Sequence, residues 1–167
     1  MPEQNLATLK RNGQTGPATI RRGPRPATTR FVPHRQLDQW PPRAIFERLI
    51  GRCLAIEGTR AWESRLASPN THALYLANEL ARGPADAFID DHEFCHVHPF
   101  PESSLHLTLP GTLRKHAIEA GWAEPHLLVH TRSVSPNLVM VYAPRDDFEL
   151  EAVLSLVRAS AQFARGV

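Results

Sequence analysis

The sequence predicts an α+β fold, a two-layer domain in which a mostly antiparallel sheet packs against helices. In three segments, apolar residues recur at every third or fourth position, which is typical of amphipathic helices. Between them, short apolar runs with period two are separated by turn-forming residues, which favours strands joined by tight turns. With 167 residues, 42% of them hydrophobic, the chain is long enough for one core and gives no reason to expect two.

The first 35 residues differ in composition from the rest of the chain. They hold seven Lys and Arg against one acidic residue, whereas the remainder holds twelve against sixteen. Residues 16–33 include few large apolar side chains, so they are poorly suited to form a packed element of their own. We therefore expect an extended Pro/Arg-rich arm over residues 1–35, partly disordered or docked, and a single α+β domain over residues 36–167. The arginines suit contact with nucleic acid, but a solvated tail along its own domain is the favoured interpretation.

The domain is predicted to begin with a helix that follows Pro41 and Pro42 and ends at Gly58, because proline suits the first helical turn. The apolar face of this helix consists of Ile45, Phe46, Leu49, Ile50, Cys53 and Leu54. Residues 60–76 then alternate with period two around the turn-forming residues 68–70. This alternation predicts two paired strands.

A second strand pair is predicted over residues 93–109, where the turn-forming stretch 99–103 separates two short apolar runs. Pro110 and Thr112 then open a helix that ends at Gly121. The short turn between these strands favours an antiparallel arrangement.

The remaining predicted elements are an apolar strand over residues 138–142 and a C-terminal helix. Asp146 or Asp147 caps this helix, which keeps one apolar face until Gly166. About five strands, with helices at both ends, therefore make up the predicted two-layer domain.

The sequence also indicates where in the cell the protein is found. No apolar run approaches the roughly 18 to 20 residues that span a bilayer, and no apolar segment follows the N-terminal charges as in a secretory signal. Cys53 and Cys95 lie in apolar patterns and resemble small buried hydrophobes rather than a disulfide pair. We therefore expect a cytoplasmic protein that does not associate with a membrane.

Three histidines are predicted to share one face of the sheet. Strand geometry sends Cys95 and Val97 to one side, and His96 and His98 to the other. In the partner strand the leucines occupy the core side, so His106 is expected on the same face as the other two histidines.

The chemistry of this cluster has several interpretations. Imidazoles near neutral pH act as bases, bind metal ions or form structural hydrogen bonds. His96, His98 and His106 have a spacing acceptable for a metal site, with a fourth ligand from Glu93, Glu124 or His126. The alternative is that these histidines are solvated on the free face of the sheet.

Two further segments carry candidate site residues. Residues 121–126 place Trp122, Glu124 and His126 after a helix. In this position Glu124 is suited to orient His126 as a base. The alternative is that Trp122 packs under the loop and that Glu124 and His126 face solvent. Residues 139–145 end a predicted strand with Tyr142 and Arg145. An arginine just before a helix opposes the helix dipole, so it requires a bound anion or an ion pair. The acidic residues predicted for such a pair are Asp38, Asp90 and Asp91.

Together these segments resemble the luciferase domain of fungal bioluminescence and its bacterial relatives. The resemblance rests on residues 93–98, 103–109, 121–126 and 139–145, followed by the helix near Glu149, and it spans roughly residues 90–165. The Pro-Arg-Pro stretch at 24–26 and the Pro-His-Arg-Gln-Leu-Asp segment at 33–38 are also typical of the bacterial members.

The resemblance implies a domain that, in the fungal enzymes, adds molecular oxygen to a hydroxylated pyrone luciferin; breakdown of the peroxide then releases carbon dioxide and light. It implies no flavin or other organic cofactor, and light emission is not implied for this chain. The positions that match the family motifs are His96, His98, His106, Glu124, His126, Tyr142 and Arg145. We assign the histidines and Glu124 as catalytic, and Trp122, Tyr142 and Arg145 as ligand-binding.

The leading prediction is a luciferase-domain protein that binds an aromatic or enolic small molecule in a histidine-rich pocket, as an oxygenase that uses molecular oxygen without a cofactor. One alternative is a non-catalytic small-molecule-binding or interaction module. Another is a metal-dependent enzyme that uses His96, His98 and His106.

Overall fold

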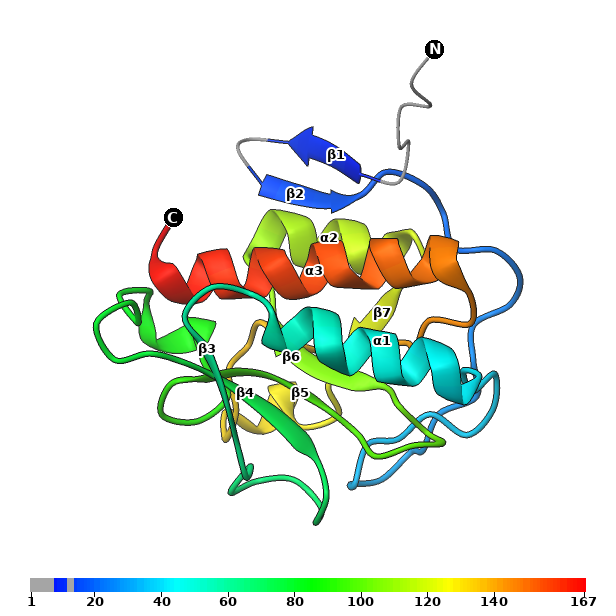
Figure 1. The fold of residues 1–167 in the computed structure, drawn as a ribbon, viewed down its shortest axis with the longest axis horizontal. Helices are drawn as coiled ribbons and strands as arrows, with labels where there is room; N and C mark the ends of the chain where they lie inside the picture. The colour runs from blue at the N-terminus through cyan, green and yellow to red at the C-terminus, as the bar shows by residue number, and fades with distance from the viewer. Residues whose placement is uncertain (1–7, 12–13) are drawn as a thin grey trace.

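The protein folds as a six-stranded antiparallel sheet with three helices on one face (Figure 1). The structure, a computed structural model, describes residues 8–11 and 14–167. In spatial order the strands are β3 (Thr59–Trp62), β4 (His72–Leu76), β5 (Glu93–Val97), β6 (Leu105–Thr108), β8 (Leu138–Val141) and β7 (Ala123–Pro125). The helices are α1 (Arg43–Leu54), α2 (Gly111–Glu119) and α3 (Asp147–Arg165). The predicted α+β two-layer fold is therefore confirmed.

The elements predicted from periodicity are present. Both predicted strand pairs form, as β3 with β4 and β5 with β6, and every neighbouring pair in the sheet is antiparallel. The estimate of about five strands is low because β7 has three residues, too few to show alternation. A separate hairpin of β1 (Thr8–Arg11) and β2 (Gln14–Pro17), which the sequence did not indicate, contacts α2 and α3 through β2.

Helix α3 is the central element of the helical layer. The Asp146 carboxylate caps its start by accepting a hydrogen bond from the Glu149 backbone N–H at 2.9 Å. Gly166 ends it with φ of +80°, a left-handed conformation that glycine adopts without steric cost. The apolar face between these caps packs on the sheet and is fully buried.

The hydrophobic core lies between the helices and the sheet. Cys95 and Val97 of β5 and Leu105 and Leu107 of β6 are all fully buried on this side. Cys53 of α1 is buried there too, and both cysteines are free. His96 of β5 and His106 of β6 alternate with these core residues and face away from the helices, as the strand pattern predicted.

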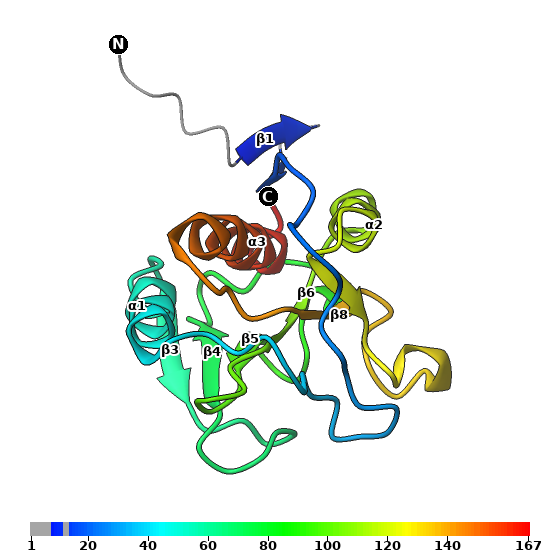
Figure 2. The same ribbon diagram turned by 90° about the vertical axis from the view of Figure 1, so that its right-hand side faces the viewer.

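The other face of the sheet is approached by residues 18–40, here called the N-terminal segment. Figure 2 shows this segment descending from the β1–β2 hairpin past β7 and β8 and then returning to α1. It is anchored to the domain by hydrogen bonds from Trp122 Nε1 to the Thr19 carbonyl oxygen at 2.7 Å, and from Arg25 to the Ala123 carbonyl oxygen at 2.9 Å. The N-terminal segment therefore covers part of the sheet face that carries the histidines.

Within the described residues, no helix combines the length and the apolar character needed to cross a membrane.

Candidate functional site

The predicted histidine cluster is present on the sheet face opposite the helices. His96 and His106 are direct cross-strand partners in the β5–β6 pair, and their Nε2 and Nδ1 atoms are 3.0 Å apart. The His98 ring stacks on His96 at 5.4 Å and meets His106 edge-on at 4.6 Å, measured between ring centroids. All three rings are buried. The strand alternation thus correctly placed three imidazoles on one face.

Two further histidines enlarge the cluster to five. His126 follows β7 and lies 4.6 Å from His106, and His34 of the N-terminal segment lies 5.2 Å from His126, between ring centroids. His34 was not among the predicted site residues because it is distant in sequence from the sheet. The signal for it in the sequence is the Pro-His-Arg-Gln-Leu-Asp segment at 33–38, which resembles the bacterial relatives of the luciferase domain.

Three carboxylates orient three of these rings. Glu93 lies 2.7 Å from His96 Nδ1, Glu102 lies 2.6 Å from His98 Nδ1, and Glu124 lies 2.6 Å from His34 Nε2. An ionised carboxylate only accepts hydrogen bonds, so each contacted nitrogen carries the proton and the opposite nitrogen keeps a lone pair. The predicted pairing of Glu124 with His126 is wrong, because Glu124 contacts His34 instead.

The Glu102 side chain is held as a carboxylate by its surroundings. Burial acts to raise its pKa, but hydrogen bonds from His98, Ser104 and the Gln36 backbone N–H outweigh burial and lower the pKa. Since Gln36 belongs to the N-terminal segment, docking of this segment also supports the orientation of His98. His98 Nε2, which makes no hydrogen bond to the described residues, is left with its lone pair available.

Two consecutive hydrogen bonds connect Glu93 to His106 through His96. Glu93 is fully buried and accepts hydrogen bonds from Ser64 and Tyr75 as well as from His96 Nδ1. His96 Nε2 is then an acceptor, so His106 Nδ1 donates to it. This arrangement leaves the lone pair of His106 on Nε2, a buried atom with no hydrogen-bond partner among the described residues.

Burial keeps the central rings neutral. Desolvation, followed by the neighbouring histidines, lowers the pKa of His106 well below its ordinary value and that of His126 to about 4. Desolvation also lowers the pKa of His96, although Glu93 partly opposes this effect. Neutral imidazoles offer lone pairs that act as bases or ligands at neutral pH.

These shifts predict that acid destabilises the fold. The folded pKa of His126 lies below the unfolded value of 6.5, so the unfolded state binds more protons and stability falls as pH decreases from about 6.5 towards 4. We expect His126 alone to account for a loss of at most about 2 kcal/mol between pH 6.5 and pH 5. Urea unfolding across this range measures it, with His126→Gln expected to show a shallower slope. A free energy of unfolding that rises over this interval would contradict the assignment.

The histidines form the floor of a cavity of about 420 Å³. Its walls are mostly apolar and come from the N-terminal segment, the β3–β4 turn, the loop after β7 and the start of β8. They include Val32, Leu66, Leu128, Val134 and Leu138. Val32 and Leu66 are more than half exposed and so lie towards solvent. Apolar walls with a few convergent polar groups are typical of small-molecule sites.

The three predicted ligand-binding residues do not line this cavity. Trp122 is fully buried in the core, where its indole N–H donates to Thr19. Tyr142 is also buried and donates to Glu124 at 2.8 Å, so it supports His34 through that carboxylate. Arg145 pairs with Glu149, not with Asp38, Asp90 or Asp91 as considered from the sequence.

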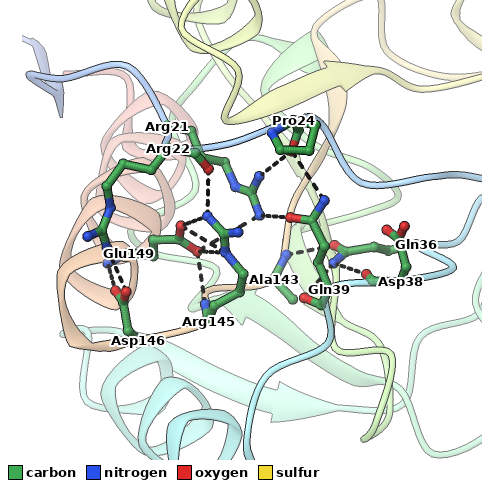
Figure 3. A network of polar contacts seen from close by, with 10 residues as sticks. All are labelled: Arg21, Arg22, Pro24, Gln36, Asp38, Gln39, Ala143, Arg145, Asp146 and Glu149. Carbon is green, nitrogen blue, oxygen red and sulfur yellow. Dashed lines mark hydrogen bonds and ion pairs between the residues drawn. The ribbon is translucent and has the colours of Figure 1, made fainter.

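The Arg145–Glu149 pair belongs to a polar network that fastens the N-terminal segment to α3 (Figure 3). Glu149 is 1% exposed and lies 3.9 Å from Arg21, which is 4% exposed and donates to Gln39. Gln36 accepts a hydrogen bond from the Ala143 backbone N–H at 2.9 Å. This network fixes both ends of the stretch that carries His34.

Comparison with known proteins relates this site to a family. Residues 91–160 match the family model described as the luciferase domain, a range that contains His96, His98, His106 and His126. These residues are therefore similar to a luciferase domain. The matched range extends from β5 into α3. His34 lies outside this range, although its ring belongs to the histidine cluster.

Curated relatives extend the similarity of this chain beyond residues 91–160. It is 27% identical over 164 residues to the luciferases of Armillaria gallica and Armillaria ostoyae, and 25% identical over 156 residues to that of Neonothopanus nambi. Each alignment covers 84% of this chain but only 58% of the relative. The chain thus spans a little over half the length of these luciferases, and no solved structure matches it.

Proposed function

We propose that this luciferase-domain protein binds a small aromatic or enolic molecule in the histidine cavity and catalyses its reaction with molecular oxygen. The observation that supports the proposal best is His98, oriented by Glu102 at the floor of an apolar cavity. The names of the fungal relatives are consistent with chemistry of this class. A cytoplasmic setting, in keeping with the two free thiols, is part of the same proposal.

His98 acts as the general base in this proposal. Its Nε2 lone pair removes the proton of an enol or phenol hydroxyl, and Glu102 stabilises the imidazolium that forms. The resulting anion is electron rich, and one of its carbons forms a bond to oxygen. Two electrons from the substrate reduce oxygen to the peroxide level, and the proton on His98 then passes to the peroxide. No flavin is required, since the substrate is itself the reductant.

The apolar walls contribute by binding the ring of the substrate and by limiting water. A cavity of about 420 Å³ lies within the roughly 300–1,000 Å³ range of small-molecule sites. Leu128 and Leu138 line the cavity together with the imidazoles. Apolar walls beside a base suit an aromatic or enolic substrate with one ionisable hydroxyl group.

Oxygen uptake by the purified full chain tests this function. We expect consumption of oxygen with at least one member of a panel of hydroxypyrones and related enols, at one oxygen molecule per molecule of substrate. Binding of the same compounds is measured in parallel by calorimetry without oxygen.

The two readouts separate the alternatives. A compound that binds without oxygen uptake would contradict the oxygenase and favour the non-catalytic binding module. Failure of the whole panel to bind or react would contradict the proposed substrate class.

A further inference from the structure

We propose that His34, His106 and His126 bind a divalent first-row transition metal ion at the floor of the cavity. One ring nitrogen from each residue lies within 4.8 Å of the others. The three residues are between 1% and 7% exposed, so the site is shielded from bulk solvent. This inference goes beyond the proposed function, since metal binding requires no organic ligand.

Glu124 fixes the tautomer of the first ligand, His34. His34 Nε2 donates to this carboxylate, which leaves the lone pair on Nδ1. Burial acts to raise the pKa of Glu124, but hydrogen bonds from His34, Tyr142 and Thr28 outweigh burial and lower it. His34 Nδ1 is buried and has no hydrogen-bond partner among the described residues. A histidine held by a carboxylate behind it is the usual arrangement of a metal ligand.

The hydrogen bonds from Glu93 through His96 fix the tautomer of the second ligand, His106. Because His106 Nδ1 donates to His96, the free lone pair is on Nε2, which is likewise buried and unpartnered in the described structure. An unpaired buried polar atom is costly, and here two such atoms lie in one triad. A cation between them would satisfy both lone pairs.

The third ligand, His126, is held less firmly. Its Nδ1 accepts a hydrogen bond from the Leu128 backbone N–H at 3.2 Å, long enough to be exchanged for a metal bond. Zinc–nitrogen bonds of about 2.0–2.1 Å would bring neighbouring ligand atoms to about 3.3 Å in a tetrahedral site. His126 directly follows β7, and metal binding would require its ring to move towards the other two.

The residues named by the sequence for a metal site fit less well. His96, His98 and His106 have a similar spacing. However, His96 uses both ring nitrogens, Nδ1 for Glu93 and Nε2 for His106, and so has no free lone pair. The geometry therefore favours the triad that includes His34.

The donor set identifies the class of ion. Three neutral imidazoles without a carboxylate suit zinc, copper, iron or nickel rather than magnesium or calcium. All three histidines line the cavity, so a fourth position would face a bound molecule, as in catalytic rather than structural sites.

Metal titration of the full chain tests the inference. Protein stripped with a chelator is titrated with Zn²⁺ by calorimetry and with Co²⁺ by visible absorption. We expect one ion per chain with Kd of about 1 µM or tighter. His34→Asn and His126→Gln are each expected to weaken binding by about 100-fold or more, whereas His130→Gln, which alters an exposed histidine, leaves it unchanged.

Either of two results would overturn the inference. The first is wild-type binding weaker than about 1 mM. The second is full binding by folded His34→Asn and His126→Gln with loss in His98→Gln, which would place the ion in the other triad. Far-UV circular dichroism establishes that each variant is folded. Because the titration contains neither substrate nor an oxygen readout, its failure is distinguishable from failure of the proposed oxygenase.

Discussion

Replacement of Glu149 by glutamine is expected to lower the free energy of unfolding by about 3–5 kcal/mol, because it removes the carboxylate that forms an ion pair with the buried Arg21 guanidinium. Arg145 loses the same partner. Since both arginines lie in the network that fastens the N-terminal segment, the variant is also expected to release the segment that carries His34. Urea unfolding monitored by tryptophan fluorescence measures the change in stability.

Glu151→Gln is the matched control on the same helix. Glu151 forms a surface ion pair with Arg52, and such pairs contribute at most about 1 kcal/mol. A loss of stability in Glu149→Gln no larger than in this control would show that the network does not hold the N-terminal segment in place.

The His98→Gln variant is expected to lower kcat for oxygen uptake by about 100- to 10,000-fold, with little change in KM. Glutamine retains polarity and approximate length but cannot accept the substrate proton at neutral pH. Since the apolar walls remain, binding of the substrate is expected to persist. Initial rates at saturating substrate and oxygen measure the effect.

His130→Gln provides the control for this prediction, because His130 is exposed in the short 3-10 turn Val129–Thr131 and does not line the cavity. Its kcat should stay within about twofold of wild type, a change of less than about 0.5 kcal/mol in the barrier. Equal kcat values for His98→Gln and His130→Gln would contradict the assignment of His98 as the general base.

The part of the site that could be predicted from the sequence is the part set by local geometry. Alternation along a strand is independent of the rest of the fold, so His96 and His98 were correctly placed opposite Cys95 and Val97. The leucines of β6 fixed the orientation of His106 in the same way. Apolar spacing similarly located the three helices, with a proline before α1 and α2 and the Asp146 cap before α3.

The remaining features depend on contacts between distant segments. The N-terminal segment docks through arginine and backbone hydrogen bonds rather than an apolar stripe, so periodicity did not bring His34 to the cluster. Trp122 was expected near a ligand, but its large apolar surface is buried in the core. Arg145 was interpreted from the adjacent helix dipole alone, whereas its counter-charge, Glu149, is supplied one turn into that helix.

A crystal structure of the full chain with a bound hydroxypyrone, prepared without oxygen, tests the central claim most directly. The ligand ring is predicted to lie against Leu128 and Leu138, with its ionisable oxygen within about 3.2 Å of His98 Nε2. A ligand bound outside the cavity, or inside it with that oxygen turned away from the histidines, would contradict the assignment of this site as the catalytic centre.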